Sequence, residues 1–147
     1  MEIKLDKIDF AILDILKENS KQGNKEIANQ IGLTITPTYE RIKRMERIGV
    51  IEGYTIKVNK AKVGKNLQVF SEVSLKEHNL ELLKGFEKKV VALEEVINCF
   101  HIAGDYDYAL LIEVADMNEY EFFLRHKLTS IPYISNVRSS FVMNSLK

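Results

Sequence analysis

Apolar residues in the first third of the chain recur with the period of an α-helix, and they predict three helices. In residues 8–16 they return every three or four positions, behind Asp6 or Asp9 as an N-terminal cap. A second, shorter pattern covers residues 24–31 and ends in a glycine turn. A third helix is predicted to begin at Thr34. This end of the chain is therefore expected to be a small helical unit.

The third predicted helix combines small hydroxyl residues at its start with positive charge further along. Thr34 or Thr36 can cap it, and Pro37 is tolerated in a first turn whose amide needs no partner. Its buried positions are expected to be Thr38, Ile42, Met45 and Ile48. The outward positions are Tyr39, Glu40, Lys43, Arg44 and Arg47, with Arg41 beside the buried stripe.

Two short helices joined by a glycine turn are typical of a unit that reads the major groove of DNA. Small side chains let the backbone approach the base edges, arginines pair with guanine or phosphate, and lysines add positive charge. On spacing alone, a plain three-helix bundle fits equally well. Residues Val50–Val58 contain two short strand patterns around Glu52-Gly53. They predict a hairpin of the kind that forms a wing behind a recognition helix, which favours DNA binding.

The pattern changes after residue 60. A polar connector at 61–66 is followed by an expected series of strand, helix, strand, strand, helix and strand. The strands are predicted at 67–75, 96–102, 108–114 and 134–143, and the helices after Asn79 and over 117–128. This order predicts a ferredoxin-like α+β domain.

A four-stranded sheet of this size covers only one of its faces with its helices. Alternation within 67–75 places Leu67, Val69, Val73 and Leu75 on one face and Phe70 on the other. We expect the uncovered face to pair partly with a second copy of the chain, through Phe70, Tyr106, Tyr108 and Phe141.

Composition fits a compact protein and excludes several other classes. Of the 147 residues 46% are hydrophobic and 29% charged, with 21 basic against 21 acidic side chains, which argues against disorder and against a uniformly basic surface. Cys99 has no partner for a disulfide, the chain does not start like a secretion signal, and it has no long apolar run. We therefore expect a cytoplasmic protein without a membrane span.

Chemistry-bearing residues do not gather into a catalytic pattern. His78, His101 and His126 lack the spacing of metal ligands, and glycine-rich phosphate loops are absent from the sequence. We expect no metal, no cofactor and no enzymatic activity.

Four segments of the sequence form an ordered set that spans almost the whole chain. They are Leu5-Asp6-x-x-Asp9-x-x-Ile12-Leu13, Gly32-Leu33-Thr34, Arg41-Ile42-Lys43-Arg44-Met45-Glu46-x-x-Gly49-Val50-Ile51, and Gly104-Asp105-Tyr106-Asp107-Tyr108. Together they resemble the leucine-responsive regulatory protein/asparagine regulator (Lrp/AsnC) family of transcription regulators.

The resemblance implies a two-domain regulator. A winged helix-turn-helix would cover residues 5–60, with the helix-turn-helix at about 24–43, and a linker at 61–66 would join it to a ligand-sensing and dimerisation domain over 67–147. It also implies a homodimer that assembles into tetramers or octamers, and an amino acid that modulates assembly or DNA affinity.

On this basis we expect a sequence-specific regulator that binds double-stranded DNA. The residues expected to touch bases or nearby phosphates are Thr34, Thr36, Tyr39 and Arg41. The residues expected chiefly to anchor the DNA backbone are Lys43, Arg44 and Arg47.

By the same resemblance, the effector site lies between sensing domains of adjoining dimers. Its lining would come from the turn Gly104, Asp105, Tyr106 and Asp107 and from the last strand at Arg138, Ser139 and Ser140. An α-amino acid needs acceptors for its ammonium, which Asp105 or Asp107 can supply, and donors for its carboxylate, such as the Gly104 amide and Ser139. The alternative is that both aspartates satisfy amides of their own turn.

Two other functions remain open. One is an amino-acid-binding sensor that acts through a protein partner and would show no salt-dependent DNA affinity. The other is an enzyme of amino-acid metabolism, which turnover surviving removal of residues 1–60 would favour.

Overall fold

The computed structural model describes residues 4–146, which form two compact units. One unit ends at Lys57 and the other begins at Val58, so the segment 61–66 belongs to the second unit. Residues 1–3 and Lys147, which include part of the N-terminal segment and the end of the second expected domain, lie outside the described residues. Within residues 4–146, no helix is long and apolar enough to cross a membrane.

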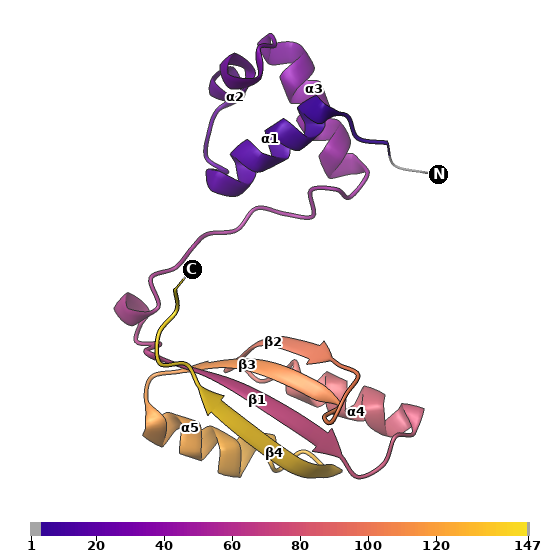
Figure 1. Ribbon diagram of the computed structural model, residues 1–147, viewed down its shortest axis with the longest axis vertical. Helices are drawn as coiled ribbons and strands as arrows, with labels where there is room; N and C mark the ends of the chain where they lie inside the picture. Colours follow the sequence, from indigo (N-terminus) through magenta and orange to yellow (C-terminus); the bar gives the residue numbers. More distant parts are fainter. Residues whose placement is uncertain (1–3, 147) are drawn as a thin grey trace. The chain divides into compact units, whose positions relative to one another are not determined.

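The first unit is built from the helices at the N-terminal end of the chain (Figure 1). They are α1 (Lys7–Glu18), α2 (Asn24–Ile31) and α3 (Ile35–Arg47). Asp6 is the N-cap of α1, as expected, because its carboxylate accepts hydrogen bonds from the amides of Ile8 and Asp9. Gly32 ends α2 with φ 71°, a left-handed conformation that glycine adopts without strain.

The core of this unit follows the predicted helical stripe, with two differences. Ile12, Ile27, Ile42 and Met45 are buried together, and Thr38 is fully buried on α3. Ile48, expected in the core, is 38% exposed, because α3 ends at Arg47 and Ile48 no longer follows the helical stripe. Asp9 is fully buried, although the apolar pattern predicts only a capping role for it.

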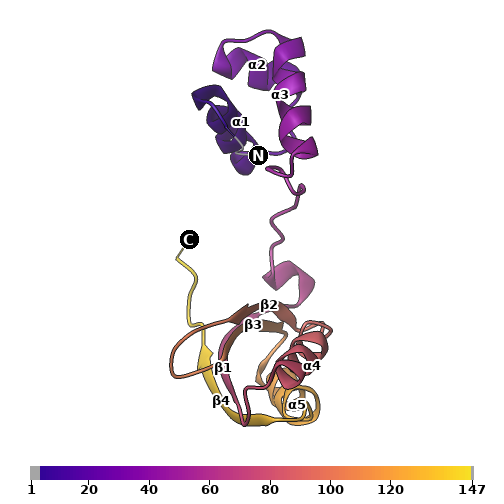
Figure 2. The ribbon, with the colours of Figure 1, turned by 90° about the vertical axis from the view of Figure 1, so that its right-hand side faces the viewer.

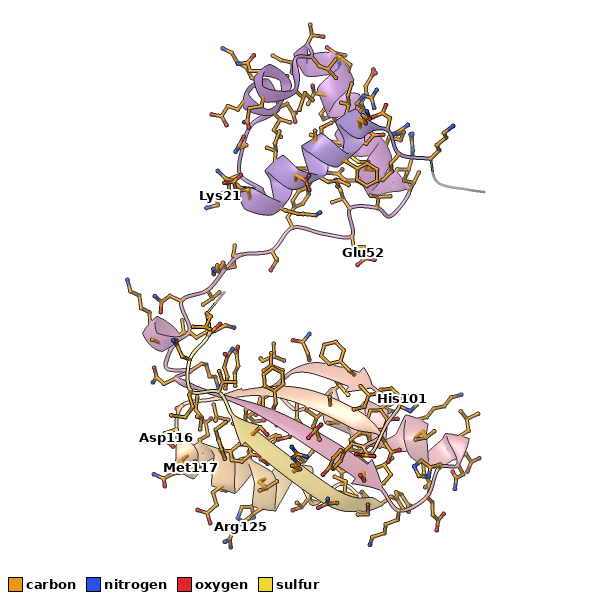
Figure 3. All side chains as sticks on the ribbon, in the orientation of Figure 1. Lys21, Glu52, His101, Asp116, Met117 and Arg125 are labelled. Carbon is orange, nitrogen blue, oxygen red and sulfur yellow. The ribbon has the colours of Figure 1, made fainter. Side chains whose placement is uncertain are left out.

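The two strands expected within Val50–Val58 do not form. The segment has no strand assignment, and Ile56 is 74% exposed. A two-stranded hairpin is only marginally stable in water unless a third strand or a packed face supports it. In the single chain this stretch is therefore an irregular segment; Glu52, which lies on it, is labelled in Figure 3.

The second unit has the predicted order of elements after a short 3₁₀ turn, η1 (Ala61–Val63). Its strands are β1 (Leu67–Leu75), β2 (Val96–His101), β3 (Tyr108–Val114) and β4 (Ile134–Phe141), and its helices are α4 (Leu80–Val90) and α5 (Met117–Phe123), which continues as a π-helical turn, η2 (Leu124–Leu128). The strands pair antiparallel in the order β2-β3-β1-β4. Both helices lie on the same side of the sheet (Figure 2), which is the ferredoxin-like arrangement.

The covered face of the sheet contains more of the aromatic residues than expected. Tyr108 is buried there with its ring centroid 4.6 Å from that of Phe86, and Phe141 meets Tyr120 edge to face at 5.3 Å. The expectation that Tyr108 and Phe141 lie on the open face is therefore wrong. The open face contains Phe70, as predicted. It also contains Phe100, because Phe100 pairs with Ala109, which pairs in turn with Glu72 on the same face as Phe70.

The first residues of α4 and α5 are apolar but largely exposed to solvent. Leu80 and Met117 are each the first residue of a helix, and they are 65% and 53% exposed. Figure 3 labels Met117 beside its N-cap Asp116 at the start of α5. Burial in this unit begins one or two turns later, where the helices pack on the sheet.

Candidate nucleic-acid interface and effector site

One side of α3 is open to solvent and the opposite side is packed into the unit. Thr38, Ile42 and Met45 are buried, which leaves the other side of the helix free. Its exposed side chains are Ile35, Thr36, Tyr39, Glu40, Lys43 and Arg47. An exposed helix of 13 residues with hydroxyl groups at its start matches the shape of a major-groove reader.

Thr34 precedes α3 as its N-cap, but its side chain makes no capping hydrogen bond. Its carbonyl oxygen accepts the hydroxyl of Thr38 at 2.9 Å, which explains how a buried threonine is satisfied. The Thr34 hydroxyl is exposed and has no partner among residues 4–146. It can therefore bond to a group outside the chain.

Two of the expected DNA contacts are instead engaged within the protein. The Arg41 guanidinium donates through Nη1 to Asp6 at 2.7 Å and to Asp9 at 2.8 Å, and only 27% of its side chain is exposed. Arg44 donates through Nη2 to the second oxygen of Asp9 and keeps 40% of its side chain exposed. We call this cluster of Asp6, Asp9, Arg41 and Arg44 the α1–α3 clamp.

The clamp is organised around the buried carboxylate of Asp9. Besides the two arginines, Asp9 accepts the backbone N–H of Asp6 at 3.0 Å, so both of its oxygens are bonded. The backbone N–H of Asp9 and the Arg41 guanidinium lower the pKa of Asp6, and the two aspartates raise the pKa of Arg41. The sequence held one signal for this role: Asp9 lies three residues before buried Ile12, on the core stripe.

A second polar group lies in the same C-terminal half of α3. Lys43 bonds to Glu46 at 2.7 Å, and the Tyr54 hydroxyl donates to the other Glu46 oxygen at 2.9 Å. The Lys43 ammonium is also 5.8 Å from the ring centre of Tyr39. Among the four expected cations of α3, only Arg47 has no partner within the described chain.

In the second unit, Asp107 is tied to residues outside its own turn. Its carboxylate accepts the Leu75 amide at 2.7 Å and contacts His78 Nε2 at 2.7 Å. Burial raises the pKa of Asp107, but these two hydrogen bonds, together with charge interactions with His78 and His101, outweigh burial and lower the pKa overall. Asp105 is exposed and has no side-chain partner within residues 4–146, while Tyr106 is half-buried. His78 was not predicted at this site, since it belongs to a loop distant in sequence.

The last strand divides its three candidate residues between the two faces of the sheet. Ser139 lies on the covered face and bonds to the Tyr120 hydroxyl, which also lies 3.0 Å from Ser71. On the open face, Arg138 pairs with Glu72 at 3.5 Å and Ser140 is exposed. Strand β1 separates β4 from β3, so a single chain does not bring these residues together with the Gly104–Asp107 turn.

Comparison with known proteins assigns a family to both units. Residues 5–52 match the model of a winged helix-turn-helix DNA-binding domain, and residues 68–147 match the Lrp/AsnC ligand binding domain. The Bkd operon transcriptional regulator of Pseudomonas aeruginosa is 34% identical over 97% of this chain and 94% of its own. The leucine-responsive regulatory protein of Escherichia coli K12 is 36% identical over 97% of this chain and 87% of its own.

Solved structures agree with this assignment over the full length of the fold. A transcriptional regulator of Neisseria meningitidis, in complex with L-methionine, has a TM-score of 0.94 and 31% identity, covering 98% of this chain and 93% of that one. An AsnC family transcriptional regulator of Agrobacterium tumefaciens has a TM-score of 0.93 and 34% identity, with 97% and 93% covered. This chain therefore belongs to the Lrp/AsnC family, as a transcriptional regulator that joins a DNA-binding helix-turn-helix to a ligand-binding domain.

Proposed function

We propose that this regulator binds specific double-stranded DNA sites through the exposed side of α3, as a homodimer that assembles further into tetramers or octamers. The observation that carries the proposal is the division of α3 into a buried side and an exposed side with hydroxyl, aromatic and cationic groups. In a dimer, two such helices would enter successive major grooves about 34 Å apart.

The contacts within the chain support a division of labour among the candidate residues. Thr34, Thr36 and Tyr39 are exposed and lie in the first half of the recognition surface, where base edges are read. Lys43 and Arg47 supply charge for phosphates, and Arg44 supplies the part of its side chain that remains exposed. For Arg41 we propose a role other than the expected base contact: its hydrogen bonds to Asp6 and Asp9 support a residue that holds α3 against α1.

Dimer formation is supported by the open face of the second unit's sheet. Phe70 is 49% and Phe100 is 53% exposed on that face, beside the ion pair of Glu72 and Arg138. Large apolar side chains surrounded by polar groups are typical of an interface between subunits. We infer that two copies pair through this face.

An amino acid is the effector we propose, bound where the Gly104–Asp107 turn of one chain meets the last strand of another chain in the assembly. The exposed Asp105 carboxylate can accept hydrogen bonds from the ammonium group of the amino acid. The exposed Ser140 hydroxyl can donate a hydrogen bond to its carboxylate. Asp107 would orient the turn through Leu75 and His78, and Ser139 would support β4 through Tyr120. The L-methionine complex of the Neisseria relative supports this class of ligand.

The DNA interface is tested by removing Arg47, the one α3 cation without a partner in the described part of the chain. Arg47→Ala should weaken binding to all duplexes and reduce the slope of log affinity against log salt by about one. The matched control is Arg125→Ala, which removes an exposed arginine from the ligand-binding unit (Figure 3). Fluorescence anisotropy at several salt concentrations measures both.

Two results would contradict the proposal. Equal affinities and salt slopes for the two variants would remove α3 from the interface. Amino-acid binding by calorimetry without any salt-dependent DNA affinity would instead favour a sensor that acts through a protein partner.

A further inference from the structure

The exposed side of α3 has a single acidic group near its centre. Positions 36, 40, 43 and 47 follow one another at helical spacings of four, three and four, so their side chains share one side of the helix. All four are exposed. Glu40 therefore lies one turn from the hydroxyl of Thr36 and one turn from the ammonium of Lys43.

Glu40 has no partner among residues 4–146, although cations stand at both positions where a helix usually pairs them. A glutamate commonly pairs with a basic residue three or four positions later. Here Lys43 bonds to Glu46, and Arg44 bonds to Asp9 of the clamp. Both neighbouring cations are therefore directed to other carboxylates, which leaves the Glu40 carboxylate open to a donor from outside the chain.

An unpaired carboxylate on a DNA-facing surface is unfavourable with most sequences. The phosphates of DNA repel it, so it lowers affinity for every duplex unless it gains a hydrogen bond there. In the major groove, glutamate typically accepts a hydrogen bond from the N4 amino group of cytosine. A carboxylate that weakens binding to most DNA sequences but gains a hydrogen bond at one base provides specificity through both the repulsion and the attraction.

We propose that Glu40 is a specificity-determining residue that accepts a hydrogen bond from the N4 amino group of a cytosine in each half-site. This inference rests on the proposed function, because it requires α3 to enter the major groove. It also assigns base preference to a residue other than Arg41, which the clamp holds against α1.

The test compares the site preferences of three full-length proteins: the wild type, Glu40→Gln and Glu18→Gln. Glu18 is the matched control, because it is an exposed glutamate on α1 without a partner in the described part of the chain. Duplexes selected from a random library define each preference, and anisotropy titrations of single-base variants measure it. Thermal unfolding confirms that both variants fold, as expected for exposed, unpaired positions.

For the wild type we expect a required cytosine at one position of each half-site, with about a tenfold loss of affinity for any other base there. Glu40→Gln should lose this preference or change it to adenine, which glutamine recognises, and should bind unrelated DNA more tightly. Glu18→Gln should keep the preference of the wild type.

The outcomes distinguish the role of Glu40 from the DNA binding on which it depends. If Glu40→Gln keeps the cytosine preference, or loses affinity equally for all duplexes, the assignment of Glu40 is overturned while the regulator still binds DNA. If the wild type binds no duplex in a salt-dependent manner, the proposed function fails and the inference fails with it.

Discussion

The two units of the chain are stabilised by different means. In the described part of the ligand-binding unit, thirteen buried residues form one cluster between the sheet and its two helices, including Phe86, Tyr108 and Phe123. The corresponding cluster of the DNA-binding unit has four buried residues among those described, and beside it lies the Asp9 carboxylate with its two arginines. A small helical unit thus combines a limited apolar core with an ionic contact between helices.

This difference has consequences for function. Apolar burial is non-directional and needs no particular charge state. A buried ion pair depends on geometry and on both charges, and removing one partner leaves the other charge uncompensated. The clamp therefore adds a directional, charge-dependent contact between α1 and α3 to the apolar ones, and it uses two arginines that were expected to contact DNA.

The largest expected effect comes from the apolar core. Phe86→Ala should lower the free energy of unfolding of the ligand-binding unit by about 4 kcal/mol, because it removes a buried ring and leaves a cavity. Hydrogen exchange resolved by peptide measures each unit separately. Phe100→Ala, at a 53% exposed position, is the control and should change protection far less in a monomeric sample. Similar losses for both variants would contradict the assignment of the core.

The clamp should give a somewhat smaller effect, confined to the other unit. Asp9→Asn removes the charge that compensates Arg41 and Arg44, and should cost about 3 kcal/mol in the DNA-binding unit and weaken DNA binding. Asp14→Asn on the same helix is the control, since its pair with Lys17 is 75% exposed on both sides and should contribute close to zero. Hydrogen exchange and anisotropy would refute the clamp if the two variants behaved alike.

The smallest effect is a pH dependence at the edge of the clamp. Because the pKa of Asp6 is lowered in the folded state, its contribution is present above the unfolded pKa of about 4 and is lost as pH falls through the folded value. The difference in Tm between the wild type and Asp6→Asn should therefore shrink between about pH 6 and about pH 3. Circular dichroism melts measure it, and a constant difference over this range would show that the charge of Asp6 is not involved.

Local pattern was sufficient for most of the fold. Strands Leu67–Leu75 and Tyr108–Val114 begin and end where the alternating and continuous apolar patterns predict, and α1 begins after the predicted cap at Asp6. These features depend on neighbours within a few residues, which the sequence displays directly. The prediction of a hairpin in Val50–Val58 was wrong, because a pair of strands needs a supporting surface from distant parts of the chain, which local pattern does not reveal.

The candidate site was predicted less completely than the fold. The sequence by itself determined which residues share the exposed side of α3, because a helix repeats every 3.6 residues. Only the tertiary structure decided which charged side chains are already paired. Arg41 bonds to Asp9, which is 32 positions away in the sequence, and His78 bonds to Asp107, which is 29 positions away. Periodicity specifies the side of an element, whereas the pairing of charges depends on which distant groups the packing brings within bonding distance.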